Sequence, residues 1–409
     1  MKTIDLRSDT VTLPTKEMLE YMISVPLGDD GRAKGNKGED PTAVKAEAYV
    51  AEVFGKEDAI FVPSGSMGNM VCVATHCERG EKAITAKNMH MYKAEKGIFS
   101  EALCGVLPVC LPHTKGVYDF AELEKALQGG NIKLVCLENT YNFEGGCVIS
   151  REDIEKILEI TKRYGVKTHM DGARIFNAAA YLGISVAELT KGIDSVQFCV
   201  SKGLSAPIGS FVVGSSEFIA AARGTRKLLG GQLRQVGLLE AGGEYAIRHL
   251  SARVAHDNAR ARKLAEGIQN AKDISIDMST VQTNIVKVDL HGQLKGKDWL
   301  RALEEEAHVR AHYITDDSIR LVTYRGISDE DIEFYYMSQY LTETCFDKIR
   351  SEQEEDVLAE EAKKYYDEHE AEFRGETFDE SLEEIYYLLY SEMYDQKLKE
   401  IKDDMTIEK

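Results

Sequence analysis

The chain has 409 residues, of which 43% are hydrophobic and 29% are charged. These proportions are typical of a soluble globular protein and exclude a mainly disordered chain. The longest apolar stretches fall far short of the roughly 18 residues that a membrane helix needs, and the first residues, MKTIDLRSDT, have no apolar segment of a signal peptide. We therefore expect a cytoplasmic protein without a membrane partner.

The net charge of -19 is concentrated at one end of the chain. Residues 351–409 contain 21 acidic and 7 basic residues, so this tail carries -14 and the other 350 residues carry only -5. Because phosphate contacts need clustered lysines and arginines, this distribution excludes a dedicated nucleic-acid binder. The eight cysteines include no C-x-x-C pair, so no metal site is predicted.

The first part of the chain predicts an arm, a loop and the start of a sheet. Residues 1–25 are expected to form an extended arm and a short helix, which Pro14 opens and which runs over residues 15–23. Residues 26–42 are rich in glycine and charge and predict a loop. A helix over 43–54 follows, and residues 58–76 then fit a strand, a turn and a helix.

Strands and helices alternate from there on, with a helix predicted over 151–164, for example. This alternation predicts an α/β fold whose mostly parallel sheet is covered by helices on both faces. The expected strands are 82–86, 105–111, 133–138, 167–171, 195–200 and 210–213.

The last third of the chain predicts a smaller domain and a tail. A long polar helix over about 245–270 leads into an α/β layer with strands near 283–289 and 318–323. In the tail, Thr377 and Glu380 fit a capping box, and two helices are expected, broken near Arg374 and Gly375. The second would carry an apolar stripe at Leu382, Ile385, Tyr386, Leu389, Met393 and Leu398. We predict an arm (1–25), a large domain (26–245), a small domain (246–345) and an acidic helical extension (346–409).

Ligands of parallel α/β sheets lie beyond the carboxyl ends of the strands, so reactive residues at those ends are the site candidates. Four segments qualify: PSGSMGN (63–69), ENTYN (138–142), HMDGAR (169–174) and SKG (201–203). The first is a strand-to-helix turn of small residues, whose backbone N–H groups suit a phosphate. A tight turn with a helix cap would give the same pattern.

Asp171 ends one predicted strand, and Lys202 follows the next. They can form a simple ion pair, but they are also the residue types that pyridoxal phosphate (PLP) requires. A lysine amine forms a Schiff base with the aldehyde, and a carboxylate keeps the pyridine nitrogen protonated. Together with a phosphate-binding turn upstream, the two residues indicate a PLP site.

Three further residues have two interpretations each. Arg174 and Arg320 either bind a carboxylate or form structural salt bridges. His90 is either a packed histidine or a flat ring that stacks on a pyridine ring.

The sequence resembles the threonine aldolase group of the β-eliminating lyase family over about residues 3–335. The matching segments are IDLRSDTVTLPT (4–15), GEDPT (38–42), FVPSGSMGN (61–69), His90 with Glu95, ENTYNFEGG (138–146), HMDGARIFNA (169–178), SKGLSAPIGS (201–210), RKLLGGQLRQ (226–235), TNIVKVDL (283–290) and RLVTYRGISDEDI (320–332).

The resemblance implies a fold-type-I PLP enzyme that cleaves a β-hydroxy-α-amino acid, of the L-threonine or L-allo-threonine type, to glycine and an aldehyde. It also implies a homotetramer of tight dimers with shared active sites. By motif, Lys202 would be the Schiff-base lysine, Asp171 would pair with the pyridine nitrogen and His90 would stack on the ring. Gly65 and Ser66 would hold the phosphate, which Arg234 would approach from a neighbouring subunit, and Arg174 would contact the cofactor or the substrate. Ser8, Arg174 and Arg320 would bind the substrate carboxylate.

The substrate side of the site departs from the family pattern. Tyr141 stands where the family has a histidine that contacts the β-hydroxyl, and Tyr324 replaces a second histidine. A phenol with a pKa near 10 is a weak base at neutral pH, although Tyr141 could still form a hydrogen bond with the substrate. The family's GDDVYGEDPT is GDDGRAKGNKGEDPT here, and the acidic tail has no counterpart.

Three hypotheses follow from these observations. The leading one is a PLP-dependent aldolase, with Lys202, His90 and Tyr141 as catalytic residues. The second is a PLP-dependent β-eliminating lyase that acts on a serine-like or cysteine-like amino acid. The third is a non-catalytic protein with the same fold, whose acidic tail binds a partner; the intact Lys202 and Asp171 argue against it.

Overall fold

The structure is a computed structural model that describes residues 3–34, 37–271, 273–291, 295–305, 308–332, 355–369, 377 and 385. The chain divides into two compact units, Met1–Asp329 and Glu330–Lys409. The first unit contains all described strands and every predicted site residue. No helix in the described part of the chain is long and apolar enough to cross a membrane.

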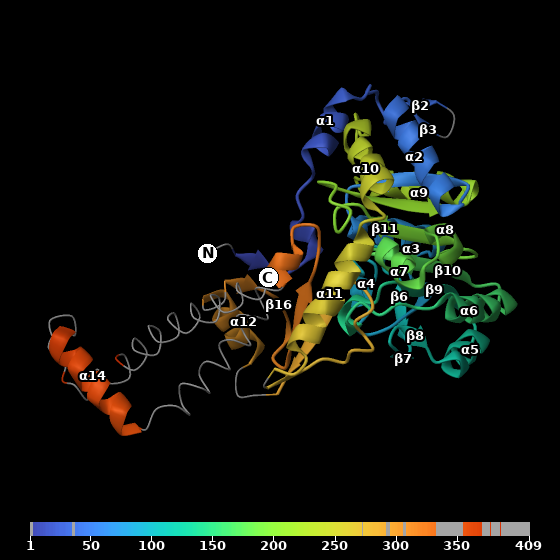
Figure 1. Ribbon diagram of the computed structural model, residues 1–409. Helices are drawn as coiled ribbons and strands as arrows, with labels where there is room; N and C mark the ends of the chain where they lie inside the picture. The colour runs from blue at the N-terminus through green and yellow to red at the C-terminus, as the bar shows by residue number, and fades with distance from the viewer. Residues whose placement is uncertain are drawn as a thin grey trace. The chain divides into compact units, whose positions relative to one another are not determined.

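A seven-stranded sheet organises the first unit, in the order β4-β12-β11-β10-β9-β5-β6 (Figure 1). All neighbouring pairs are parallel except those of β12, which runs antiparallel to both β11 and β4. The predicted mostly parallel α/β sheet is therefore confirmed, and each predicted strand is present to within two residues at either end. The strands are β4 (Asp58–Val62), β5 (Lys82–Thr85), β6 (Leu107–Cys110), β9 (Ile132–Glu138), β10 (Lys167–Asp171), β11 (Ser195–Cys199) and β12 (Ser210–Gly214).

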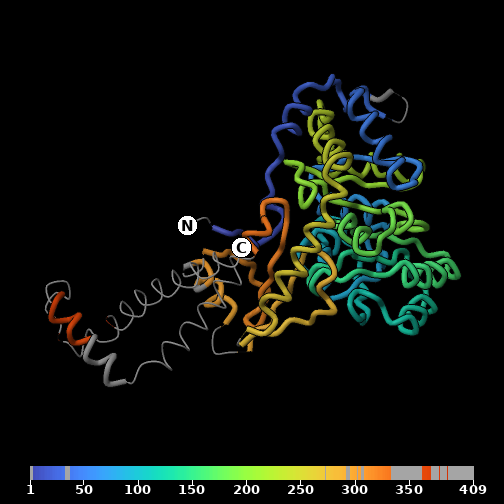
Figure 2. The backbone as a smooth tube through the Cα atoms, in the orientation of Figure 1, coloured from blue at the N-terminus to red at the C-terminus, as the bar shows by residue number. Residues whose placement is uncertain are grey.

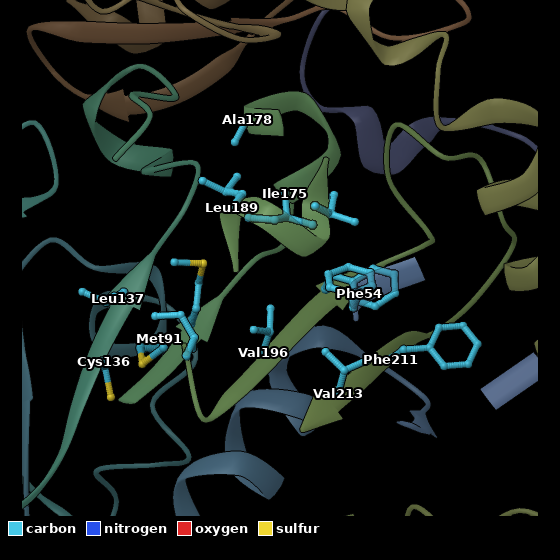
Figure 3. Close-up of a cluster of buried hydrophobic side chains, with 14 of the residues drawn as sticks. Phe54, Met91, Cys136, Leu137, Ile175, Ala178, Leu189, Val196, Phe211 and Val213 are labelled. Atoms are coloured by element: carbon cyan, nitrogen blue, oxygen red, sulfur yellow. The ribbon is translucent and has the colours of Figure 1, made fainter. Parts of the chain in front are cut away.

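Apolar residues that alternate along the strands cover both faces of this sheet. Ile60, Val62 and Val212 pack with residues of helices α3 (Gly65–His76) and α9 (Ser216–Leu228). Phe211 and Val213 belong instead to the larger cluster, in which Phe54, Ile175 and Leu189 also lie (Figure 3). These three come from α2 (Pro41–Phe54), α7 (Ile175–Leu182) and α8 (Val186–Leu189). The two-residue period of the strands thus separates two helical layers.

Local capping explains where the helices begin. Asp40 accepts hydrogen bonds from the backbone N–H groups of Thr42 and Ala43, and Pro41 occupies the first turn of α2. Ser64 caps α3 in the same way through Met67. The other helices of the first unit are α1 (Lys16–Ser24), α4 (His90–Lys93), α5 (Phe120–Gln128), α6 (Arg151–Arg163), α10 (Gly237–Leu250), α11 (Val254–Ile268), α12 (Gly296–Glu305) and the 3-10 turns η1 (Asp9–Val11) and η2 (Asn142–Glu144).

The predicted single helix over 245–270 is wrong, because the structure has two helices, α10 and α11. The Ser251 hydroxyl donates to the carbonyl of Ile247, 2.6 Å away, and the N–H of Arg253 bonds to the carbonyl of Leu250 three residues back. These bonds replace the regular helical pattern for one turn. The predicted loop at 26–42 also contains a short hairpin of β2 (Ala33–Lys34) and β3 (Lys37–Gly38).

A four-stranded antiparallel sheet forms the other layer of the unit, in the order β13-β14-β17-β16. It includes both strands predicted for the small domain, and α11 packs against β14. The bounds are β13 (Ile274–Ser275), β14 (Ile285–Leu290), β16 (His312–Thr315) and β17 (Ser318–Val322), and a separate hairpin pairs β7 (His113–Thr114) with β8 (Val117–Tyr118).

The N-terminal arm is bound to this second layer. Strand β1 (Ile4–Asp5) pairs in parallel with β15 (Val309–Arg310), and the N–H of Val322 donates to the carbonyl of Leu6. Figure 2 shows the arm as a blue segment beside the orange backbone of the second layer. The arm therefore enters η1 in a fixed position, and η1 carries Asp9.

In the second unit the structure describes one helix, α14 (Glu355–His369), with Ala362 and Tyr366 buried. Of the predicted capping box and apolar stripe, Thr377 and Ile385 are described. The break near Arg374 and Gly375 and the remaining residues of those predictions lie outside the described residues. The four domain boundaries stay a prediction.

Candidate active site

A cavity of about 100 Å³ lies beyond the carboxyl ends of β9 and β10. It contains six of the predicted residues, although they come from distant parts of the sequence. The lining residues are Ser8, Thr10, His90, Glu138, Thr140, Asn142, Asp171, Ala173, Arg174, Lys202 and Arg320. A larger cavity of about 530 Å³, lined by His76, Lys167 and Asp194 among others, contains none of the predicted residues.

Lys202 follows the end of β11 and lines the cavity. Its carbonyl accepts a hydrogen bond from the Thr12 hydroxyl at 3.0 Å, which ties this loop to the N-terminal arm. Among the described residues, no ion-pair or hydrogen-bond partner is recorded for its ammonium group. An amine held in a partly buried cavity without a dedicated partner is suited to covalent chemistry.

Asp171 ends β10, and donors surround its carboxylate. The Asn69 side-chain amide and the Ala173 backbone N–H each donate to it at 3.0 Å. Gln197, its neighbour in register on β11, donates at 2.9 Å in the amide orientation that satisfies all of its partners. The carboxylate of Asp171 is thus oriented by three hydrogen-bond donors.

His90 begins α4, and its Nδ1 lies 3.1 Å from the buried carboxylate of Glu95. Burial alone would lower the pKa of His90, but the hydrogen bond to Glu95 and the charges of Asp171 and Glu138 raise it overall. The backbone N–H of His90 donates to Glu138, which also accepts from the N–H of Asn142. Glu138 therefore fixes two loops of the site.

Burial and the nearby Asp171 carboxylate raise the pKa of Glu138 to about 7. Glu138 lines the cavity and ends β9, so it is a second carboxylate beside Asp171, to which it is adjacent in register. Like charges oppose one another, so the Asp171 carboxylate disfavours a second anion at Glu138. Glu138 can therefore hold a proton near neutral pH.

Two arginines form the opposite wall. Arg174 is buried and makes two 2.7 Å hydrogen bonds to the Asp9 carboxylate, from Nε and from one terminal nitrogen. The Asn142 side-chain oxygen accepts from Arg174 at 3.2 Å and from Arg320 at 2.8 Å. The Nε of Arg320 is buried and has no partner in the described structure. Arg320 thus keeps unused donor capacity, and burial together with Arg174 lowers its pKa to about 10.

Gly65 and Ser66 do not line the cavity; they form the first turn of α3. Backbone N–H groups of a first helical turn have no acceptor within the helix, and the helix dipole favours an anion there. The turn is pressed against β11: a Cβ on Gly65 would lie 2.8 Å from Cys199 Sγ, and one on Gly68 would lie 2.5 Å from Gln197 Cγ. Only glycine permits this close approach, which places the helix start beside Asp171.

Tyr141 and Arg234 also lie outside the lining of the cavity. The Tyr141 hydroxyl donates to Asn88 at 2.7 Å and lies 3.2 Å from His113 Nε2, and its ring packs on His113. Burial raises the pKa of Tyr141 further, so it stays a neutral phenol, and it is not among the lining residues. Arg234 is 67% exposed and pairs with Asp29 at 3.3 Å.

Comparison with known proteins identifies the family of this chain. Residues 5–291 match the family described as beta-eliminating lyase. The chain belongs to this family. It is 40% identical over 344 residues to low-specificity L-threonine aldolase 1 of Arabidopsis thaliana, and the match covers 82% of this chain and 94% of that protein.

Solved structures show the same fold. A putative L-allo-threonine aldolase from Listeria monocytogenes superposes with a TM-score of 0.69 at 18% identity, over 82% of this chain and 95% of that one. A structure described as SPT with the PLP internal aldimine gives a TM-score of 0.64 at 19% identity, over 82% and 87% of the two chains. The fold is therefore the α/β fold of PLP enzymes of fold type I.

His90, Glu95 and Asp171 place ligand atoms within 4.8 Å of one another, a spacing that a metal ion could use. In this beta-eliminating lyase the space between the two carboxylates is taken by an amide. Asn69 Nδ2 donates to Glu95 Oε1 at 3.0 Å and to Asp171 Oδ2 at 3.0 Å. The cluster is therefore a hydrogen-bonded support for Asp171 and His90.

Sequence reasoning did not single out five residues that the site uses: Asp9, Asn69, Glu138, Thr140 and Asn142. All five lie within segments that the family resemblance covers, and all except Asp9 also lie in a predicted strand-end segment. Their position at a strand end was the available signal. Their hydrogen-bond partners, which lie up to 275 residues away for Asp9, have no signature in the sequence.

Proposed function

We propose that this chain is a PLP-dependent aldolase that cleaves a β-hydroxy-α-amino acid of the L-threonine or L-allo-threonine type to glycine and an aldehyde. Family membership and the name of the Arabidopsis relative support this activity. The observation that carries the proposal is the cavity itself, where three groups meet: a lysine amine without a hydrogen-bond partner among the described residues, a carboxylate with three donors and an arginine with unused donors.

The residues fit PLP at each contact that the cofactor requires. The Lys202 amine would hold its aldehyde carbon, and the ionised Asp171 would hold its pyridine nitrogen. The first turn of α3, at Gly65 and Ser66, would bind its phosphate, and the His90 ring would lie against its ring. When bound, PLP supplies an electron sink for the negative charge that remains on the glycine carbon after cleavage.

The substrate carboxylate is assigned to Arg320, with Ser8 and Arg174 beside it. Arg174 already uses Nε and one terminal nitrogen on Asp9. Arg320 has a buried Nε without a partner in the described structure and donates to a neutral amide oxygen of Asn142. A planar guanidinium recognises a carboxylate with two parallel hydrogen bonds, so Arg320 has the larger share of this interaction.

The proton of the β-hydroxyl needs an acceptor near neutral pKa. Glu138 has a pKa of about 7 and lines the cavity, whereas the Tyr141 hydroxyl donates to Asn88 outside the lining. We therefore assign proton acceptance to Glu138, directly or through a water molecule, rather than to the predicted Tyr141. Tyr141 keeps a structural role in this proposal.

The proposal includes a homo-oligomer, as a dimer of dimers, in which Arg234 contacts the phosphate of a neighbouring subunit. In its own chain Arg234 is 67% exposed and reaches only the surface carboxylate of Asp29 among the described residues. A cytoplasmic location is also proposed, because all described cysteines are free thiols, as expected in a reducing compartment.

The test is product analysis by proton NMR after PLP-loaded protein is mixed with L-threonine or L-allo-threonine. We expect glycine and acetaldehyde, and no product from Lys202→Ala. The control variant is Lys191→Ala, which removes an exposed lysine outside the cavity and should leave turnover unchanged.

Other products would contradict the proposal in different ways. Formation of 2-oxobutyrate without glycine would assign the chain to the eliminating reaction, in which the same lysine removes the α-proton. A Lys202→Ala variant that kept full activity would show that the lysine is not the cofactor residue, whatever the product.

A further inference from the structure

A stripe of polar residues, buried except for the half-buried His76, lies between α3 and the central sheet. On α3, Asn69, Cys72 and His76 are spaced by three and four residues, so they share one face of the helix. On the facing strands, His169 of β10 is in register with Ser195 of β11. An apolar stripe would be expected at a helix-sheet contact, so these polar side chains need an explanation.

Hydrogen bonds connect the stripe into a chain. His76 Nε2 lies 2.9 Å from Ser195 Oγ, which lies 3.0 Å from His169 Nδ1. His169 Nε2 lies 3.1 Å from Asn69 Oδ1, and Asn69 Nδ2 donates to Asp171 at 3.0 Å. The chain therefore begins at the larger cavity, which His76 lines, and ends at Asp171 in the active site.

The direction of each hydrogen bond follows from the carboxylates at the active-site end. Asn69 must turn its NH2 group toward Asp171 and Glu95, because neither carboxylate can donate. Its oxygen then faces His169, so His169 must carry a proton on Nε2. Burial lowers the pKa of His169 to about 3, so the ring is neutral and its Nδ1 is an acceptor.

The remaining links are fixed in turn. Ser195 donates its single hydroxyl proton to His169 Nδ1, although the carbonyl of Ser195 also lies 3.2 Å from that nitrogen. Ser195 Oγ must then accept from His76, which carries its proton on Nε2. Burial lowers the pKa of His76 to about 4 and raises the pKa of the adjacent Cys72 thiol, so both groups are neutral near pH 7.

We infer that His76, Ser195, His169 and Asn69 form a one-way chain of hydrogen-bond donors that holds Asp171 as the anionic partner of the cofactor's pyridine nitrogen. Every link donates toward the carboxylate, and hydrogen bonds that point the same way strengthen one another in a buried site. These are positioning residues, since they act through Asp171. The inference rests on the proposed function only in that PLP is the group opposite Asp171.

Breaking the hydrogen-bond chain should shift the proton that Asp171 and the ring nitrogen share. Without the chain, the Asp171 carboxylate is less stabilised and holds a larger share of this proton. A ring whose nitrogen has less positive charge is a weaker electron sink. It also makes the Lys202 nitrogen, where it is bonded to the cofactor, more basic. The visible absorption band of the bound cofactor should then change at a higher pH.

The test compares Ser195→Ala, His76→Phe and the double variant with the wild-type protein, all loaded with PLP. His76→Phe keeps the ring stacking on Phe218, which lies 4.5 Å away between centroids. The control is Thr161→Val, a buried residue of α6 whose hydroxyl donates to Leu158 in the same helix. The readouts are the pH midpoint of the cofactor band, kcat and KM.

We expect Ser195→Ala to raise the midpoint by about half a pH unit and to lower kcat about fivefold, the effect of one hydrogen bond, with KM nearly unchanged. His76→Phe should shift it in the same direction, and the double variant should not exceed Ser195→Ala, because the link is already broken. Ser195→Ala leaves in place the other ionisable groups that act on Asp171 or His76, namely His90, Cys72, Cys136, Glu138, His169, Arg174, Asp194 and Lys167.

A midpoint for Ser195→Ala that equals that of Thr161→Val would overturn the inference, as would additive shifts in the double variant. The comparison of midpoints still tests the hydrogen-bond chain if the wild-type protein binds PLP but forms no glycine. In that case only the aldolase proposal fails. If no cofactor band forms at all, 15N NMR of the histidines in the cofactor-free protein decides it: a proton on Nε2 of His169 supports the chain, and one on Nδ1 overturns it.

Discussion

Replacing Asp9 by asparagine tests whether the arm positions the arginine wall of the cavity. Asp9 is fully buried in η1 and holds Arg174 with two 2.7 Å hydrogen bonds. Its Oδ2 also accepts from Asn284 at 3.1 Å. In Asp9→Asn the Arg174 guanidinium stays buried without a compensating negative charge, which is the costly case for a buried ion pair.

The expected loss of folding free energy in Asp9→Asn follows from the pKa of Asp9. Burial would raise this pKa, but Arg174 outweighs it and lowers the pKa from 3.8 to about 2. Each unit corresponds to about 1.36 kcal/mol, so the ionised carboxylate contributes about 2–3 kcal/mol to folding at pH 7. Removing one partner of a buried pair costs about 3–5 kcal/mol, so the expected loss in Asp9→Asn is about 3 kcal/mol.

The stabilising contribution of the Asp9 carboxylate decreases as the pH falls. Because the folded-state pKa of Asp9 is lowered, its contribution is complete above about pH 4 and is lost as the pH falls toward 2. The difference between wild type and Asp9→Asn should therefore shrink by about 1 kcal/mol between pH 7 and pH 3. Urea unfolding at one fixed protein concentration measures it, since the stability of an oligomer depends on concentration.

Asp317→Asn is the matched control. Asp317 pairs with Lys295 at 2.7 Å, but both side chains are more than half exposed, so its removal should cost far less than removal of the buried Asp9. The reasoning is refuted if Asp9→Asn loses no more stability than Asp317→Asn at pH 7. A loss that is the same at pH 7 and pH 3 would refute the assignment to the carboxylate charge.

Three further predictions follow from the site. Arg320→Lys should raise KM for the amino acid about tenfold in steady-state assays with a smaller change in kcat, because an ammonium cannot replace the planar fork; an unchanged KM would contradict the carboxylate assignment. Tyr141→Phe should leave kcat/KM within about threefold but lower the free energy of unfolding by about 1 kcal/mol, since Asn88 loses a donor. A loss of turnover without a loss of stability would instead indicate that Tyr141 acts directly in the reaction. Gly68→Ala should lower the free energy of unfolding by about 1–3 kcal/mol and weaken PLP binding, because its Cβ would lie 2.5 Å from Gln197 Cγ; unchanged thermal stability and cofactor affinity would argue against the close contact.

The alternation of strands and helices predicted the large sheet because each strand is a short apolar run with clear breaks on both sides. It did not show that β12 is antiparallel, since direction depends on the connection and not on the strand's own residues. The helical period also continued across Ser251, where one side-chain hydrogen bond to Ile247 is enough to end a helix. Such local competition between side chain and backbone is not visible in a periodic pattern.

The candidate site was predictable to the extent that its residues stand at strand ends. Asp171 and Lys202 follow neighbouring parallel strands, so the topology alone places them at one edge of the sheet. Asp9 does not stand at a predicted strand end, whereas Asn142 does. The partners of both residues were still not predictable, because Asp9 holds Arg174, 165 residues away, and Asn142 holds Arg320, 178 residues away. Side-chain pairs of this separation depend on the packed fold, and the orientation of Tyr141 depends on it for the same reason.

The charges of the cavity explain why its two arginines are not equivalent. Arg174 has a dedicated carboxylate in Asp9, and its pKa is raised despite complete burial. Arg320 has a neutral amide of Asn142 as its side-chain partner within hydrogen-bond distance, and its pKa is lowered to about 10 by burial and by Arg174. A buried cation whose partner is a neutral amide gains more from an incoming anion than a cation that is already paired with a carboxylate. The proposed binding of the substrate carboxylate therefore falls mainly on Arg320, while Asp9 already pairs with Arg174.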